Sequence, residues 1–367
     1  MRAVVCHDFE DARIEDVPRP EPGPEEVLVD VRRVQLSVTE CELYRGKKIA
    51  HHESVRDRLA DGPARLFGHE FSARVVERGE RVDHVDVGDR VYAPAKVHCG
   101  ECTYCRSGYE LYCPTKTYVG YDVPGALAEF AAIPGKALRS VPSSLSDAEV
   151  AALQPLASSI LSVRDSGIET GDVVAVVGTG VMGYQCAQLA LLEGAQRVYV
   201  VDVNPEKLRI AAERGLDPID ATEVDPVRAV TEHTDGVGAD VVFEAVGGEQ
   251  SHATSGSDPI AQAVEMVRAG GTVVQVGYVI GDVTFSARAI RKKSVTWNNP
   301  VTGVATVGPG RDTGGLAAEL VASDRVSIEE YVTHELDGLD EFERAVTITA
   351  DKERFDARGP AQIVVNE

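Results

Sequence analysis

The chain of 367 residues has no long uninterrupted hydrophobic run and few lysines. Its longest apolar stretch, around residues 173–193, contains glycines and the polar Gln185 and Gln188, which argues against a membrane span. The first residues lack the apolar core of a secretory signal, and we therefore expect a cytoplasmic protein. Lysine supplies only 9 of the 37 basic residues, against 59 acidic ones, which excludes nucleic-acid binding through phosphate contacts.

The net charge of −22 comes from acidic residues that are scattered along the whole chain. Concentrated salt screens the repulsion between such charges, and a hydrated acidic surface preserves solubility. The composition therefore predicts a protein adapted to high salt, that is, a halophilic protein. An ordinary acidic cytosolic enzyme is the alternative.

Four of the seven cysteines lie in one short segment with the spacing C-x2-C-x2-C-x7-C. They are Cys99, Cys102, Cys105 and Cys113. Four thiolates can surround one Zn²⁺ tetrahedrally and leave no open position, so we predict a structural zinc lobe over residues 96–115. An iron–sulfur cluster is the alternative, but the ferredoxin pattern needs its last Cys-Pro pair closer than Cys113-Pro114.

The stretch from Val173 to Asp202 has the pattern of a dinucleotide-binding unit. A valine-rich run predicts a buried strand, three glycines follow with the spacing G-x-G-x-x-G, and helical periodicity then continues to Gly194. A second strand, 197–202, ends on an acid about twenty residues after the glycines. This order favours a Rossmann unit over a glycine-rich turn in another α/β fold.

Asp202 is suited to accept hydrogen bonds from a ribose 2′-hydroxyl and to repel a 2′-phosphate. Because no arginine follows it closely, the sequence favours NAD over NADP. The candidate nucleotide-binding residues are Gly178, Gly180, Val181, Met182, Gly183, Asp202, Val246, Val276 and Asn298.

The first part of the chain has the pattern of a β-rich domain. Alternating residues predict strands at 2–5, 27–34 and 71–77, and a turn followed by a helix is expected over 37–46. The polar segment 47–66 predicts a surface loop in which His51 and His52 are solvated. The β pattern returns at 125–132, and a helix beginning at Ser146 is expected to lead into the second domain.

From Gly171 onward, strands and helices alternate. Such alternation predicts a doubly wound parallel sheet. The expected strands after the Rossmann unit are 240–244, 272–276 and 294–297, and the expected helices are 205–214, 224–232 and 258–269. Residues 252–258 are expected to form a polar loop. Helices at 313–323 and 338–348 and a strand at 361–365 are expected to return to the first domain.

The chain resembles the zinc-containing medium-chain alcohol dehydrogenases of the sorbitol and butanediol dehydrogenase type. The matching motifs are Gly68–Glu70, Gly88–Val91, the four cysteines, Gly120–Asp122, Gly125–Phe130, Pro155–Ala157, Gly178–Gly183 and Asp202. The resemblance implies an α/β protein with a GroES-like catalytic domain, 1–152 and 299–367, interrupted by a Rossmann domain, 153–298. It also implies a cleft where substrate and nicotinamide meet, and homodimers or homotetramers.

In this family a second zinc polarises the alcohol that is oxidised. Its ligands are an early cysteine, the histidine of Gly-His-Glu, sometimes the glutamate of that motif, and an acid or cysteine at the start of the crossover helix. His69 and Glu70 match, whereas Ser37 and Gln154 stand where the family has cysteine and glutamate. A hydroxyl and a carboxamide are neutral and bind zinc more weakly than a thiolate and a carboxylate.

Three alternatives follow for this catalytic site. In the first, His69 and Glu70 hold a labile zinc with weak help from the two substituted positions and water. In the second, a local shift of the chain brings Cys41 to the metal as a ligand in place of the missing family cysteine. In the third, no metal takes part, and Thr39 performs acid–base chemistry together with the same histidine and glutamate.

The resemblance also assigns roles to neighbouring residues. Thr39 matches the hydroxyl that passes the substrate proton onward, although a threonine here could equally belong to a plain turn. Glu40 matches an acid that orients the ligand histidine. Trp297–Asn299 follows the last Rossmann strand, where its amides either contact polyol hydroxyls or form a turn before Pro300.

The predicted function is therefore NAD-dependent oxidation of a small-molecule secondary alcohol, polyol or sugar. One alternative is a zinc-independent reductase of the same superfamily acting on an activated alkene or carbonyl. Another is a non-catalytic NAD-binding sensor. The retained His69, Glu70 and Thr39, together with the complete nucleotide motif, favour an enzyme over the sensor.

Overall fold

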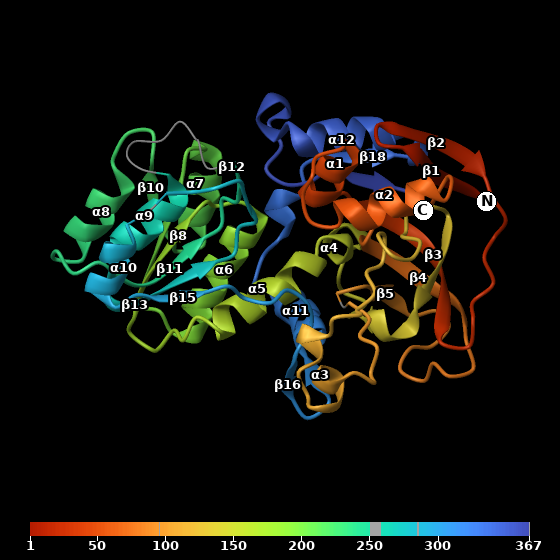
Figure 1. Ribbon diagram of the computed structural model, residues 1–367, viewed down its shortest axis with the longest axis horizontal. Helices are drawn as coiled ribbons and strands as arrows, with labels where there is room; N and C mark the ends of the chain where they lie inside the picture. The colour runs from red at the N-terminus through yellow and green to blue at the C-terminus, as the bar shows by residue number, and fades with distance from the viewer. Residues whose placement is uncertain (95, 250–257, 285, 367) are drawn as a thin grey trace. The chain divides into compact units, whose positions relative to one another are not determined.

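The computed structural model describes residues 1–94, 96–249, 258–284 and 286–366 (Figure 1). The chain divides into two compact units. The first joins Met1–Ala157 to Gly303–Glu367, and the second is Ser158–Thr302. The first boundary falls within helix α5, Gln154–Arg164. The loop expected at 252–258 lies, apart from its last residue, outside the described residues.

A seven-stranded sheet forms the centre of the first unit, in the order β18-β19-β3-β4-β5-β7 with β6 on β3. Strand β3 pairs with both β4 and β6, and its buried valines belong to the core of this unit. The strands of this unit are β1 Arg2–Asp8, β2 Asp11–Asp16, β3 Glu26–Gln35, β4 Glu70–Arg78, β5 Arg90–Tyr92, β6 Phe130–Pro134, β7 Arg139–Ser140, β16 Thr306–Gly308, β17 Arg311–Asp312, β18 Glu335–Asp337 and β19 Gln362–Val364. The predicted β-rich fold is confirmed, and Gly303–Glu367 belongs to this unit.

The helices of the first unit are short, and several begin with side-chain caps. Those that lie in this unit are α1 Val38–Tyr44, α2 His52–Ala60, α3 Thr103–Arg106, α4 Asp147–Ala151, α11 Thr313–Ala322 and α12 Phe342–Ala350. Helix α1 packs on α12, and α4 packs on β3 and β4. The helix expected to begin at Ser146 is therefore two helices, since α4 ends at Ala151 before α5 starts.

The prediction of a surface loop over 47–66 is wrong, because helix α2 occupies half of that segment. The helix is mostly polar and buries only His52 and Val55, so its apolar periodicity is weak in the sequence. The prediction that both histidines are solvated is wrong for His52, which is 8% exposed and stacks on Phe9 at 5.1 Å. His51 is half-buried.

The second unit is built on a six-stranded parallel sheet in the order β10-β9-β8-β11-β13-β15. Helix α6 packs on β8 and β9, and α9 packs on β11 and β13 (Figure 1). The elements are β8 Val173–Val177, α6 Val181–Glu193, β9 Arg197–Asp202, α7 Pro205–Glu213, β10 Asp217–Asp220, α8 Pro226–His233, β11 Ala239–Glu244, β12 Gly248–Glu249, α9 Pro259–Met266, β13 Val267–Gln275, β14 Val279–Ile280, α10 Ala287–Lys293 and β15 Thr296–Asn298. The doubly wound parallel sheet is confirmed.

Four elements of the second unit were not predicted from the sequence, namely β10, β12, β14 and α10. Strand β10 is only four residues long and contains Pro218, which an edge strand tolerates. Helix α10 is seven residues long, and its few apolar residues alternate with basic ones, so its helical periodicity is weak in the sequence. The helix expected over 258–269 ends earlier, at Met266, because β13 begins at Val267 and pairs with Ala239.

Acidic side chains lie almost entirely at the surface. Among the residues that the structure describes, only three acids are buried, namely Glu40, Glu70 and Glu244. In the same part of the chain, no helix has both the length and the apolar character that crossing a bilayer demands. The net charge of −22 is therefore carried by exposed carboxylates that repel one another.

We expect the free energy of unfolding to rise with salt concentration. The screening length falls from about 10 Å in 0.1 M salt to about 3 Å in 1 M salt, which weakens repulsion between the surface carboxylates. The midpoint of thermal unfolding, followed by circular dichroism in increasing KCl, should increase over this range. Sucrose at matched osmolality is the control, and a midpoint that stays constant or falls in KCl would indicate an ordinary acidic protein.

Candidate functional site

The first turn of α1 forms one side of the candidate catalytic site. Ser37 is the N-cap, and its hydroxyl accepts a hydrogen bond from the Glu40 backbone N–H at 3.1 Å. The Glu40 carboxylate in turn accepts from the Ser37 backbone N–H at 3.2 Å. This reciprocal capping box fixes both side chains, so Ser37 and Glu40 are held by the helix start itself. Thr39 lies between them in the same turn and is half-buried.

Glu40 also holds His69. Its Oε1 accepts from the His69 backbone N–H at 3.2 Å and lies 2.7 Å from the ring Nδ1. The histidine follows a turn in which Phe67 and Gly68 both have left-handed backbones, with φ of 66° and 76°. A carboxylate at Nδ1 fixes the orientation of the ring and leaves Nε2 for chemistry.

Glu70 begins strand β4 and is 4% exposed. Its Oε2 accepts from the Gln35 carboxamide at 2.6 Å, and Gln362 donates to Gln35 at 3.2 Å. The other oxygen, Oε1, lies 3.7 Å from His69 Nε2. Strands β3, β4 and β19 therefore place one carboxylate oxygen beside the free nitrogen of the histidine.

Burial and neighbouring charges shift the pKa values of His69 and Glu70. Burial alone lowers the pKa of His69, but the carboxylate of Glu40, by its charge and its hydrogen bond, and that of Glu70 raise it to about 9. Burial raises the pKa of Glu70 to about 7, against the opposing effects of His69 and Gln35. The site thus combines two buried carboxylates with a partly exposed imidazole.

The donor set fits a weakly held zinc. Two ligands of one tetrahedral zinc lie about 3.4 Å apart, and His69 Nε2 and Glu70 Oε1 are separated by 3.7 Å. Ser37 uses its hydroxyl as a helix cap. Gln154 is half-buried at the start of α5, and within the described chain no hydrogen bond joins it to Ser37, His69 or Glu70.

Recruitment of Cys41 is not supported by the geometry. Its thiol is buried against Thr349, and burial raises its pKa well above the ordinary value. Within the described part of the chain, the groups of three or more His, Cys, Asp or Glu ligand atoms that converge do not include Cys41 or His69. The first and third alternatives for the catalytic site stay open.

One residue of this site was missed in the sequence, and a second was given no role there. Gln35 ends a strand and carries no motif, so only the pairing of β3 with β4 brings it to Glu70. Tyr121 was noted only as part of a family motif. Its ring lies 5.5 Å from the His69 ring, and its hydroxyl faces Ser37.

The four cysteines of the predicted zinc lobe converge. Their Sγ atoms all lie within 4.8 Å of one another, with 3.9 Å from Cys99 to Cys105 and 3.6 Å from Cys99 to Cys113. Sulfurs on one tetrahedral zinc lie about 3.8 Å apart, so the residues fit this metal. Hydrogen bonds from Thr115 and from backbone N–H groups lower the pKa of Cys99 to about 6, whereas burial and the neighbouring cysteines raise that of Cys105 to about 12.

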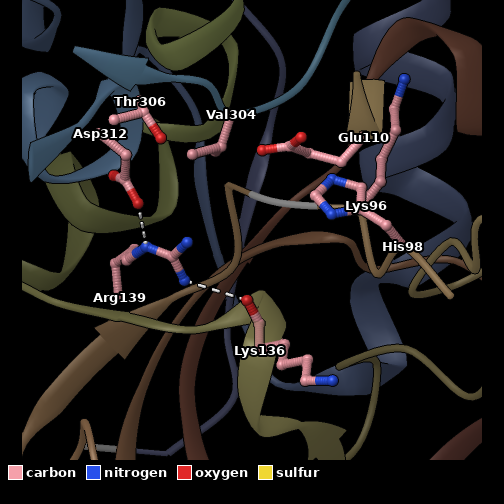
Figure 2. Close-up of a pocket in the computed structure, with 8 residues that line it drawn as sticks. All are labelled: Lys96, His98, Glu110, Lys136, Arg139, Val304, Thr306 and Asp312. Atoms are coloured by element: carbon pink, nitrogen blue, oxygen red, sulfur yellow. Dashed lines mark hydrogen bonds and ion pairs between the residues drawn. The ribbon is translucent and has the colours of Figure 1, made fainter. Parts of the chain in front are cut away.

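A cavity of about 120 Å³ lies beside this lobe (Figure 2). Its wall includes an ion pair between Arg139 and Asp312 at 2.7 Å, and Arg139 also donates to the backbone oxygen of Lys136. Figure 2 shows the Glu110 carboxylate pointing toward Val304. The cavity therefore has mixed charges that partly satisfy one another, and it contains none of the predicted catalytic residues.

The three motif glycines of the second unit have distinct environments. Gly178 has φ of 92°, and a Cβ there would lie 2.7 Å from Val246. A Cβ on Gly183 would lie 1.9 Å from the backbone oxygen of Gly178, so the helix can approach the strand only without a side chain. At Gly180, the N-cap of α6, a Cβ would meet no atom within 4 Å. This open space at a helix N-terminus suits a pyrophosphate.

Asp202 ends strand β9 beside this turn. Its carboxylate accepts from the backbone N–H groups of Thr179, Val203 and Asn204 at 2.7–2.9 Å. The carboxylate is therefore held against the glycine turn, where a ribose would follow the pyrophosphate.

The other candidate nucleotide-binding residues lie in the same unit, mostly near the carboxyl ends of the parallel strands. Val181 and Met182 form the first turn of α6, whereas Val246 and Val276 follow β11 and β13. Asn298 ends β15, and its amide donates to the backbone oxygen of Asp165 at 2.7 Å. That contact occupies part of the amide that the sequence suggested for a substrate.

Comparison with known proteins gives the family. Residues 23–143 match the alcohol dehydrogenase GroES-like domain, and residues 178–311 match the zinc-binding dehydrogenase domain. The sorbitol dehydrogenase of Halalkalibacterium halodurans is 31% identical over 88% of both chains. The erythritol/L-threitol dehydrogenase of Mycolicibacterium smegmatis is 29% identical over 95% of this chain and 94% of the relative.

A solved structure agrees over the whole length. A zinc-binding dehydrogenase from Sinorhizobium meliloti 1021, solved with NADP bound, is similar with a TM-score of 0.82 and 27% identity, covering 100% of this chain and 99% of that one. The chain therefore belongs to the zinc-binding, medium-chain alcohol dehydrogenase family. As a member of that family it is an oxidoreductase.

We expect Gly183→Ala to destabilise the protein by about 1–3 kcal/mol, since the new methyl group overlaps the Gly178 backbone. Urea unfolding followed by fluorescence measures this loss. Gly180→Ala is the matched variant from the same motif. Its methyl group meets no protein atom, so stability should be retained while affinity for the dinucleotide falls, as measured by titration calorimetry. Equal stability of the two variants would contradict the packing role of Gly183.

Proposed function

We propose that this protein is an NAD-dependent dehydrogenase that oxidises a secondary alcohol, polyol or sugar. The observation that carries the proposal is the arrangement of Glu40, His69 and Glu70, in which the free Nε2 lies 3.7 Å from a carboxylate oxygen. The relatives support the same class of substrate, because sorbitol, erythritol and L-threitol are polyols.

Each residue of the candidate catalytic site has a distinct proposed role. His69 and Glu70 are the residues that would hold a catalytic zinc, and a zinc there would supply a positive charge that favours loss of the proton from the alcohol. Glu40 fixes the His69 ring through Nδ1. Gln35 holds one oxygen of Glu70, which keeps the other turned toward the histidine. Thr39, in the first turn of α1, is the residue we assign to pass the alcohol proton onward.

The nucleotide site supports NAD in preference to NADP. Asp202 places a negative charge beside the glycine turn, where the 2′-phosphate of NADP would meet it. The relative from Sinorhizobium meliloti was solved with NADP bound, so the proposed preference of this chain for NAD rests on the Asp202 side chain. We further propose a homodimer or homotetramer, for which the exposed edge strand β15 supplies a pairing surface.

The metal-independent alternative is favoured by one observation. Ser37 and Gln154 are neutral, which leaves two strong zinc donors at the site in place of the three or four usual in the family. Metal counting therefore separates the two mechanisms.

We expect His69→Ala to reduce kcat by at least about 10³-fold because it removes the central group of the site. Dinucleotide affinity, measured by fluorescence titration with NADH, should be unchanged. His84→Ala is the matched control, since that ring hydrogen-bonds the backbone of Gly135 instead. Normal turnover of the His69 variant would overturn its assignment.

Elemental analysis of the His69→Ala variant tests whether this residue holds a catalytic zinc. Wild-type protein should contain two zinc ions per chain, His69→Ala one, and Cys102→Ser also one, with the loss at the other site. A wild type that holds one zinc and still forms NADH from alcohols would establish metal-independent chemistry. A wild type that binds NAD but oxidises no alcohol in a broad panel would indicate a sensor.

We expect Asp202→Asn to shift the ratio of kcat/KM for NADP over NAD by about tenfold toward NADP, since it removes the charge that opposes a 2′-phosphate. The amide keeps the size of the side chain and one acceptor oxygen for the backbone contacts. Initial rates with both cofactors measure the shift. An enzyme that already prefers NADP before mutation would contradict the role given to Asp202.

A further inference from the structure

His51 has a backbone conformation that its secondary structure does not require. It precedes α2 with φ of 69° and ψ of −1°, in the left-handed region. This conformation is unfavourable for a residue with a Cβ, by roughly 1 kcal/mol or more. The side chain makes no capping hydrogen bond to the helix, so the strain is not compensated there. Strained residues of this kind cluster at ligand sites.

The ring of His51 is held by two tyrosines. It stacks on Tyr121 with centroids 4.4 Å apart and planes at 10°, and it meets Tyr118 edge-on at the same distance. Tyr121 in turn contacts the His69 ring at 5.5 Å. One aromatic ring therefore separates His51 from the histidine of the candidate catalytic site.

The ring nitrogens of His51 are available to a ligand. The side chain is half-buried, and in the described part of the chain neither nitrogen takes part in a recorded hydrogen bond. These nitrogens are not among the fully buried side-chain atoms that lack a partner, so solvent reaches them and a ligand hydroxyl can replace that solvent. The neighbouring His52 differs, since its ring packs on Phe9 and approaches Glu53.

The charge state of the ring suits a hydroxyl partner. Burial lowers the pKa of His51, and the charges of Lys96, His69 and Lys116 act in the same direction, while Asp122 opposes them. A neutral imidazole has one donor and one acceptor nitrogen, and a hydroxyl group can satisfy either of them.

We propose that His51 is a specificity-determining residue that hydrogen-bonds a second hydroxyl of the substrate, at a carbon other than the one oxidised beside His69 and Glu70. The substrate class is then a diol, polyol or sugar in preference to a simple alcohol. This inference rests on the proposed dehydrogenase function and narrows its substrate. Tyr121 positions the ring, and Tyr118 limits its rotation.

The test compares kcat/KM for 2-butanol, 2,3-butanediol and erythritol in the wild type and two variants. His51→Gly removes the ring and accepts the left-handed backbone without strain, which offsets part of the packing lost with the ring, and thermal unfolding checks that the variant is folded. It should lower kcat/KM for the diol and for erythritol at least about tenfold more than for 2-butanol, mainly through KM. His51→Asn tolerates the same backbone and keeps a donor and an acceptor, so it should restore part of the loss.

His52→Ala is the matched control from the adjacent position, and its relative activity on the three alcohols should equal that of the wild type. An equal loss on all three alcohols in His51→Gly would assign the ring a structural role and overturn the inference. A wild type that oxidises 2-butanol better than either polyol would overturn the substrate class. If the wild type oxidises none of the three and no other alcohol, the proposed function itself fails, and this inference fails with it.

Discussion

The buried carboxylate of Glu40 organises the candidate catalytic site. A carboxylate that is 1% exposed is stable only if its oxygens are hydrogen-bonded, and Glu40 meets this requirement through two separate segments. It closes the capping box of α1 on Ser37 and holds both the backbone and the ring of His69. The helix start and the histidine are thereby fixed to each other, and Nε2 of the ring lies 3.7 Å from Glu70 Oε1.

The sheet of the first unit supplies the second constraint. Glu70 can be buried because Gln35 donates to it, and Gln35 is itself fixed by Gln362 from the other end of the chain. The register of β3 against β4 and β19 thus decides which carboxylate oxygen stays free. The first unit therefore needs its carboxyl-terminal segment, because β19 pairs with β3. This segment follows the whole second unit in the chain, so β19 can pair only after that unit has been synthesised.

The replacements at Ser37 and Gln154 change the electrostatics of the site. The family pattern brings a thiolate and a further acid to the metal, whereas among the described residues the carboxylates that contact the His69 ring are those of Glu40 and Glu70. Ser37 keeps a structural task as helix cap, which accounts for a hydroxyl at that position independently of any metal. By contrast, the cysteine lobe has a complete set of four converging sulfur donors.

Charge is distributed in this protein according to burial. The three buried acids have specific partners, two of them at the candidate catalytic site, while the exposed acids produce the large negative charge. Glu244 accepts from the backbone N–H groups of Val246 and Gly247, next to the nucleotide-binding turn. The buried carboxylates therefore hold neighbouring groups in place, whereas the exposed carboxylates hydrate the surface.

The sequence alone determined the features that depend on spacing along the chain. The G-x-G-x-x-G turn, the four cysteines and the alternation of strands and helices are local patterns, because neighbours within about twenty residues build each of them. Tertiary structure alone decided the contacts between distant segments, such as Gln35 with Glu70 and His51 with Tyr121. It also decided that α2 is a helix. This polar segment buries only two residues, so its hydrophobic periodicity is too weak to predict a helix from the sequence, and the helix is defined by its packing on the first unit.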